Sequence, residues 1–212
     1  IHNDIQPYKP PGARGVVLVE GLAGSLGLVS CLIQGNPIRG FKVGVWLEAA
    51  LASTTINGNQ IEQCGFGVMA RKPIAVRELA IDCNQLTRMA EAAVLVHSMA
   101  GNDSLARVSL RGNQFDAASE QPGTQVSCRS GDIVFTDNHG HHQRSPKPGV
   151  VHTGRSLIVA SNRITGDAPS SIELQPLNKD AYTLVGNITS GAITHNGGAL
   201  LPKWVPLNPI LP

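Results

Sequence analysis

Residues 54–61 read TTINGNQI, and this segment has six counterparts along the 212-residue chain. Each counterpart carries an asparagine at the position of Asn59, and consecutive asparagines are separated by 23, 25, 29, 25, 24 and 25 residues. The seven residues are Asn36, Asn59, Asn84, Asn113, Asn138, Asn162 and Asn187. A nearly constant period of this length is typical of proteins that stack one structural unit on the next.

The residues before each asparagine alternate between apolar and polar. The position three residues before the asparagine is always apolar, whereas the position two residues before it is mixed and often polar. This period of two predicts a β-strand with one buried face. The residue directly before the asparagine is small or turn-forming, which predicts a sharp bend, and apolar residues return two positions after it. Each repeat is therefore expected to contain a strand, a corner, a short strand, a loop, a further strand and a loop.

A unit of about 25 residues without a helix cannot close a hydrophobic core alone, but stacked units can. The sequence therefore predicts an all-β fold, a parallel β-helix (single-stranded solenoid) of about seven coils with an Asn ladder. In such a ladder each side-chain amide can form hydrogen bonds with the coils above and below it. We expect the asparagines to be architectural and not a ligand site.

The composition argues against several classes of protein. A net charge of +2 without a basic run argues against nucleic-acid binding, and no apolar stretch reaches the roughly 18 residues of a membrane span. The four cysteines, Cys31, Cys64, Cys83 and Cys128, show no metal-binding spacing, so we expect free thiols and no cofactor. The chain begins with Ile1, which leaves its localisation open. Free thiols favour cytoplasmic synthesis, followed by assembly into a particle or exposure at the cell surface.

The chain is expected to have three parts. Residues 1–14 read as a proline-rich lead-in loop, residues 15–200 as the β-helix domain, and residues 201–212 as a proline-rich tail that folds over the last coil. The first strand has no Asn-bearing segment before it. Since a bare solenoid end exposes strand edges, we expect this end to be covered by a missing upstream part of the chain or by a neighbouring subunit.

Two acidic residues were considered as a catalytic pair. Glu62 and Asp116 both lie three residues after a ladder asparagine, with Thr87 between them in the stack. Two strand spacings would separate them by about 9–10 Å, which could suit an inverting glycosidase. The same acids could equally be solvated turn residues, so the sequence predicts no catalytic residue.

The histidines suggest a further hypothesis. His139, His141 and His142 fall within a predicted loop, 139–149, and could hold a transition metal. A metal site also needs a fourth ligand and orienting partners, and the loop offers none. An exposed polar loop without a metal is therefore the favoured interpretation. His97 and His152 each follow a short apolar run and are interpreted as strand-end residues rather than as a catalytic base.

The repeat pattern over residues 15–200 resembles right-handed parallel β-helix proteins of the pectate-lyase-like superfamily. The stretch YTLVGNITSGAI followed by PKWVPLN is similar to the C-terminal part of large uncharacterised bacterial β-helix proteins, which resemble components found near phage-tail-like and contractile injection gene clusters. This resemblance implies a right-handed parallel β-helix.

The missing columns of acids, the few aromatic residues and the apparent truncation at the N-terminus favour a non-catalytic structural or interaction module of a larger bacterial or phage-like surface or particle protein. The alternative is a polysaccharide-binding or polysaccharide-degrading protein, either a lyase or a hydrolase. Polysaccharide is accordingly a candidate partner, and association into a homotrimer, as in tailspikes, is left open.

Overall fold

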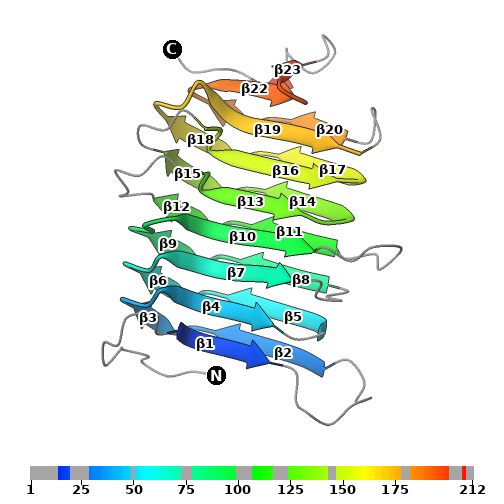
Figure 1. The fold of residues 1–212 in the computed structure, drawn as a ribbon. Helices are drawn as coiled ribbons and strands as arrows, with labels where there is room; N and C mark the ends of the chain where they lie inside the picture. The colour runs from blue at the N-terminus through cyan, green and yellow to red at the C-terminus, as the bar shows by residue number, and fades with distance from the viewer. Residues whose placement is uncertain are drawn as a thin grey trace.

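The computed structural model describes residues 14–19, 29–48, 51–72, 78–98, 107–116, 124–142, 147–177, 182–200 and 207–208. Their strands form three sheets (Figure 1). The first sheet contains β1 (Arg14–Val19), β4 (Val43–Glu48), β7 (Phe66–Lys72), β10 (Ala92–Ser98), β13 (Val126–Arg129), β16 (Val150–Gly154), β19 (Ser170–Pro176), β22 (Ala192–His195) and β23 (Gly198–Ala199).

The second and third sheets meet at the asparagine corners. The second sheet contains β2 (Val29–Gln34), β5 (Leu51–Asn57), β8 (Glu78–Asp82), β11 (Arg107–Arg111), β14 (Asp132–Thr136), β17 (Ser156–Ala160) and β20 (Tyr182–Val185). The third sheet contains β3 (Pro37–Arg39), β6 (Gln60–Glu62), β9 (Gln85–Thr87), β12 (Gln114–Asp116), β15 (His139–His142), β18 (Arg163–Gly166) and β21 (Ile188–Thr189).

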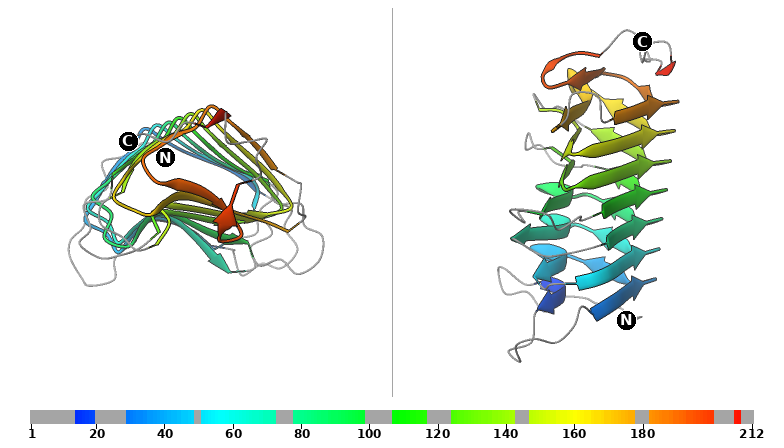
Figure 2. Two further views of the ribbon diagram at one scale, coloured as in Figure 1. Left: turned by 90° about the horizontal axis from the view of Figure 1, so that it is seen from above. Right: turned by 90° about the vertical axis from the view of Figure 1, so that its right-hand side faces the viewer.

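One strand from each sheet makes one coil, and each coil lies directly on the next. Neighbouring strands pair in parallel, and within the described residues only β22 and β23 pair antiparallel. Seen along the stack, successive coils lie over one another around an elongated interior (Figure 2). The predicted parallel β-solenoid with its order of strand, corner and short strand is confirmed.

The predicted number of about seven coils was too high for the enclosed part of the stack. In the described part of the chain, each seven-stranded sheet has five strands with a neighbour on both sides, because its first and last strands are edges. The solenoid therefore has about five enclosed turns. Counting asparagines includes the two end coils, which are flanked on one side only in the second and third sheets.

The core consists of aliphatic columns that run along the stack. The residues three positions before the asparagines are 0 % exposed in all seven repeats, and they are Ile33, Ile56, Ile81, Leu110, Phe135, Val159 and Leu184. Matching inward columns come from the other two sheets, for example Val45, Val68 and Val94 in the first sheet. The predicted buried face of the strand before each asparagine is confirmed.

At every asparagine corner, the residue directly before the asparagine has a left-handed backbone. The φ angles are 66° at Gly35, 63° at Gly58, 54° at Cys83, 61° at Gly112, 57° at Asp137, 56° at Ser161 and 66° at Gly186. A left-handed residue costs about 1–2 kcal/mol for a non-glycine. The presence of glycine at four of these seven positions follows from that cost.

The asparagines form a continuous ladder behind these corners. The backbone N–H and the Nδ2–H of each asparagine both donate to the Oδ1 of the next asparagine, at 2.8–3.1 Å from Asn36 to Asn187. Nδ2 also donates to a strand carbonyl of the preceding coil, as Asn113 does to Ile81 at 2.7 Å. From Asn59 to Asn187 each amide thus joins three successive coils, and all seven asparagines are at most 1 % exposed.

The ladder has an eighth member that the sequence interpretation missed. Asn208 accepts hydrogen bonds from the backbone N–H and Nδ2–H of Asn187 at 3.1 and 2.8 Å. Its Nδ2 donates to the Leu184 carbonyl at 3.3 Å, and Gly186 N–H donates to the Leu207 carbonyl at 2.8 Å. Residues 207–208 therefore continue the ladder onto the last coil.

Replacing Asn208 by Ala is expected to loosen the last coil and leave the rest of the stack intact. The change removes the acceptor of both Asn187 donors, and an orphaned buried donor costs about 1–3 kcal/mol. Hydrogen exchange followed by NMR should show faster exchange at the Asn187 backbone amide and unchanged exchange at the Asn84 amide. Equal acceleration at both positions, or none at Asn187, would contradict a capping role.

The predicted loop over 139–149 is wrong for its first four residues, since His139–His142 form β15 in the third sheet. The predicted lead-in, 1–14, lies outside the described residues except for Arg14, which begins β1. Most of the predicted tail, 201–206 and 209–212, also lies outside them.

Candidate functional site

The outer face of the third sheet carries two columns of polar side chains. Its strands alternate, so the residue two after each asparagine points into the core, and its neighbours point outward. The first outward column lies one residue after the asparagine and contains Gln60, Gln85, Gln114, His139 and Arg163. The second outward column, three residues after the asparagine, contains Arg39, Glu62, Thr87, Asp116, His141 and Thr165.

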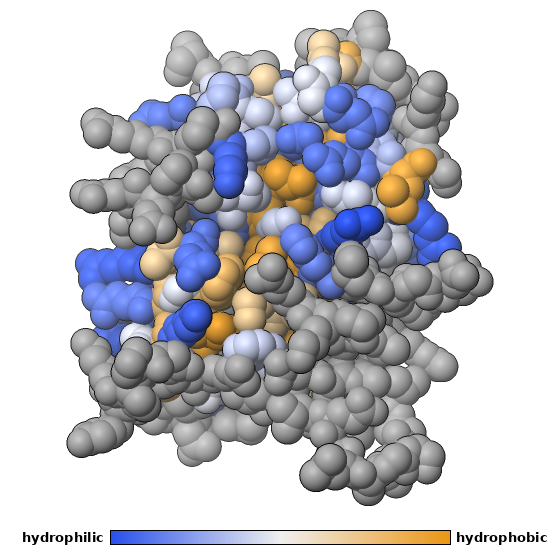
Figure 3. All heavy atoms as spheres, in the orientation of Figure 1, coloured by the Kyte–Doolittle hydropathy of each residue, from blue (hydrophilic) through white to orange (hydrophobic). Residues whose placement is uncertain are grey.

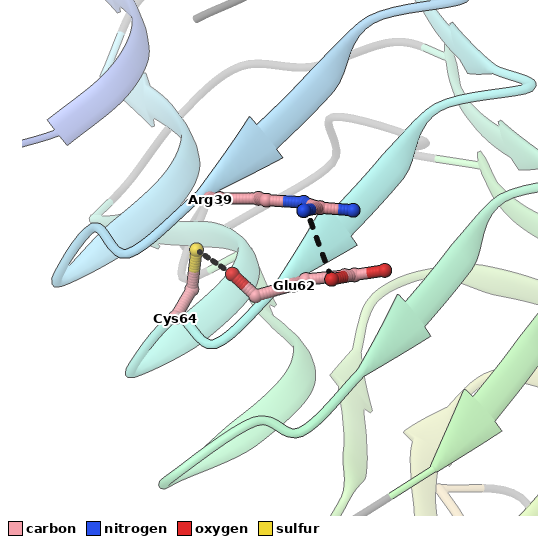
Figure 4. A network of polar contacts seen from close by, with 3 residues as sticks. All are labelled: Arg39, Glu62 and Cys64. Carbon is pink, nitrogen blue, oxygen red and sulfur yellow. Dashed lines mark hydrogen bonds and ion pairs between the residues drawn. The ribbon is translucent and has the colours of Figure 1, made fainter. Parts of the chain in front are cut away.

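The two acids considered as a pair lie in the predicted column but in different surroundings. Glu62 Oε2 lies 3.2 Å from Arg39 Nε, and the Cys64 thiol donates to the Glu62 carbonyl at 3.4 Å (Figure 4). Thr87 separates Glu62 from Asp116 in the register of the sheet. Two strand spacings correspond to about 10 Å. Glu62 is thus held by a cation, and the fold keeps the two carboxyl groups apart.

Asp116 instead borders an open groove of about 330 Å³ on the outer face. The groove spans β12, β15 and β18 and is lined by Gln114, Phe115, Asp116, His139, Gly140, His141, Arg163 and Thr165. Phe115 is only 2 % exposed. A Cβ on Gly140 would lie 2.9 Å from Ile164 Cδ1, so a larger residue here would require the end of the Ile164 side chain to shift. The accessible lining is therefore made largely of polar side chains.

The three histidines of β15 do not converge. His139 and His141 point outward, and His141 Nδ1 lies 3.2 Å from Thr165 Oγ1. His142 points inward and is 3 % exposed, and burial lowers its pKa from the usual imidazole value. Alternation along a strand separates these residues, whereas a loop could have gathered them. No group of three or more potential metal ligands of the His, Cys, Asp or Glu type is found among the described residues.

His97 and His152 take different positions. His97 lies near the end of β10, as predicted, and its Nε2 is 2.9 Å from Ser127 Oγ. The interpretation of His152 as a strand-end residue is wrong, because it lies in the middle of β16 with its side chain 0 % exposed. Its ring is 4.7 Å from that of Phe135, and burial lowers its pKa to about 3. A neutral core histidine of this kind has no access to a substrate.

The cysteines are free, as predicted, and three of them are shielded to different degrees. Cys64 and Cys128 are buried, Cys31 is partly buried and Cys83 is exposed. Burial raises the pKa of the Cys64 thiol and raises that of Cys128 to about 12. The thiolate is the reactive form of cysteine, so Cys64 and Cys128 are poor nucleophiles at neutral pH.

The first sheet carries an apolar column on its outward side. Trp46, Met69 and Leu95 are neighbours in its register, and they alternate with inward core residues such as Val45. Figure 3 shows hydrophobic side chains gathered along the middle of the face turned to the viewer, with hydrophilic side chains on both sides. None of the described segments forms a helix with the length and apolarity needed to cross a membrane.

Comparison with protein-family models, with curated proteins and with solved structures finds no match to this chain.

Proposed function

We propose that this chain is a structural or interaction module of a larger bacterial or phage-like surface or particle protein, and that it carries out no catalysis itself. The observation that carries the proposal is the unbroken ladder from Asn36 to Asn208. Each coil is fixed to the next by backbone pairing, by amide hydrogen bonds and by apolar columns. A solenoid fixed in this way suits a stem that holds its surface columns at constant spacing.

The arrangement of acids supports a non-catalytic role over polysaccharide cleavage. Inverting glycoside hydrolysis uses one carboxylic acid and one carboxylate on opposite sides of the same bond. Glu62 is paired with Arg39 at 3.2 Å, and Thr87 lies between it and Asp116. Burial raises the pKa of Asp82 while Arg111 acts against the shift, but Asp82 belongs to the second sheet. Among the described residues that line the groove beside Asp116, there is no second acid.

Incubation with a panel of plant, algal and bacterial polysaccharides tests this proposal. We expect no increase in reducing ends and no absorbance from unsaturated products. Release of either product by the purified chain would reject the non-catalytic role. A double variant, Glu62→Ala with Asp116→Ala, would then decide whether that pair is responsible, since its removal should abolish turnover.

The partner that we propose for the module is a neighbouring subunit, including two further copies of this chain in a homotrimer. Sedimentation equilibrium of the 22.3 kDa chain distinguishes a monomer from a trimer directly.

A further inference from the structure

We infer that the outer face of the second sheet binds a second copy of this chain, with the two stacks antiparallel and a two-fold axis between β8 and β11. The inference rests on the proposed role as an interaction module, and it names one further copy as the neighbouring subunit. It starts from the positions of the charged residues on this face.

The outward side chains of the second sheet form three columns. The middle column lies four residues before each ladder asparagine and is uncharged; from β2 to β17 it contains Leu32, Thr55, Ala80, Ser109, Val134 and Ile158. The two outer columns, two and six residues before the asparagine, hold all the charged residues of the described strands of this sheet, which are Glu78, Asp82, Arg107, Arg111 and Asp132. An uncharged middle between polar rims is typical of protein–protein interfaces.

The charges at the centre of this face are complementary under a two-fold rotation. In the register of the sheet, Arg107 and Arg111 of β11 lie beside Glu78 and Asp82 of β8. A two-fold axis parallel to the strands and midway between β8 and β11 reverses the order of the coils but keeps each column over the same column. Glu78 then faces Arg107 of the second copy, and Asp82 faces Arg111 of the second copy. Symmetry repeats both pairs.

Other two-fold arrangements of the same face bring like charges together or lose the pairs. An axis along the stack places each coil against itself, so the acids of β8 meet acids and the arginines of β11 meet arginines. An axis between β11 and β14 keeps one pair, Arg107 with Asp132. Like charges across an interface oppose association. In the inferred arrangement Asp132 faces Ser53 and meets no like charge.

The same axis also brings apolar side chains together. Leu32 is 51 % exposed on β2, Ile158 is 41 % exposed on β17, and each strand is the third one away from the axis. Leu32 therefore faces Ile158 of the second copy. Ala80 and Ser109 are small, which allows the two sheets to approach to about 10 Å. Six strands about 4.8 Å apart, each with about five residues, cover roughly 500 Å² on each copy, and the pair reaches the roughly 1,000 Å² of a specific interface.

Sedimentation equilibrium of two double variants and of their mixture tests the inference. The wild type should approach twice 22.3 kDa as its concentration is raised. Arg107→Glu with Arg111→Glu leaves only acids at the centre of the face, and Glu78→Arg with Asp82→Arg leaves only arginines. Each double variant should self-associate at least about a hundredfold more weakly than the wild type, because like charges then face each other. An equimolar mixture should form a heterodimer as tight as the wild-type dimer, since every acid again faces an arginine.

A matched control is Arg129→Glu with Arg163→Glu, which makes the same change in net charge at exposed positions of β13 and β18 in the other two sheets. It should dimerise as the wild type does. Ile158→Asp, at an exposed position, should weaken the dimer without touching the charged rows. It decides the matter if a double variant does not fold.

A monomeric or trimeric wild type would overturn the inference. Double variants that associate as the wild type does, or folded double variants whose mixture stays monomeric, would overturn it as well. A monomeric wild type without product release from polysaccharides would leave the proposed function standing, with a different neighbouring subunit. Product release would reject the proposed function and leave the arrangement of the dimer untouched.

Discussion

Asn113→Ala is expected to lower the free energy of unfolding by on the order of 4 kcal/mol, because it breaks the ladder in its middle. Asn113 Oδ1 accepts from the backbone N–H and Nδ2–H of Asn84 at 3.0 and 3.1 Å. Its Nδ2 donates to the Ile81 carbonyl at 2.7 Å and to Asn138 Oδ1 at 3.0 Å. Alanine leaves these partner groups buried without the hydrogen bonds to Asn113, and its methyl group cannot fill the space of the amide.

Asn57→Ala is the control for this prediction. Asn57 lies two residues before the ladder residue Asn59, in the outward column of the second sheet, and its side chain is partly exposed. Its replacement should change stability by no more than about 0.5 kcal/mol. Urea unfolding followed by circular dichroism measures both variants. A loss for Asn113→Ala no larger than that for Asn57→Ala would contradict a stabilising ladder.

A fall in pH is expected to destabilise the fold through His152. Burial lowers its folded-state pKa from 6.5 to about 3, so the folded protein keeps this imidazole neutral while the unfolded chain protonates it. The stability that depends on the neutral form is complete above the unfolded pKa of 6.5 and is lost as pH falls towards 3. The slope approaches about 1.4 kcal/mol per pH unit between these values, with a total of at most about 5 kcal/mol.

His152→Leu tests this contribution. Leucine has a similar volume, retains contact with Phe135 and cannot take up a proton. The difference in stability between the variant and the wild type should therefore grow in favour of the variant from pH 7 to pH 4. His139→Gln, at an exposed position, serves as the control and should follow the wild type. A constant difference for His152→Leu across this range would contradict protonation of a buried imidazole on unfolding.

Much of the fold could be predicted because the same residue pattern occurs seven times in the sequence. The apolar residue three positions before each asparagine is buried in every coil, and the small residue before the asparagine has a positive φ in every coil. Local backbone geometry and burial restrict which residue types can occupy these two positions, so both positions can be recognised in the sequence. Asn208 was missed because Leu207, and not a small or turn-forming residue, precedes it, although its Asn-Pro-Ile sequence matches that of Asn36-Pro37-Ile38. The shared tripeptide was the signal that could have found it.

The candidate site was less accessible to sequence reasoning. The composition of His139–His142 suggests a loop, since glycine and histidine have no strong strand preference. The position of this segment directly after Asn138 was the better guide, because the neighbours β12 and β18 impose a strand there. The prediction compared acids within one column and so considered Asp116 only with Glu62. The groove joins Asp116 to residues of both outward columns, which becomes visible only when coils are stacked in register.

Hydrogen exchange of the asparagine side-chain amides, measured by NMR, tests the central claim most directly. The Nδ2–H groups of Asn59, Asn84, Asn113, Asn138 and Asn162 each donate to the next amide and to a carbonyl of the preceding coil. We predict that they exchange orders of magnitude more slowly than the side-chain amide of Asn57. Exchange of these five amides at the rate of Asn57 would show that no interior ladder holds the coils together.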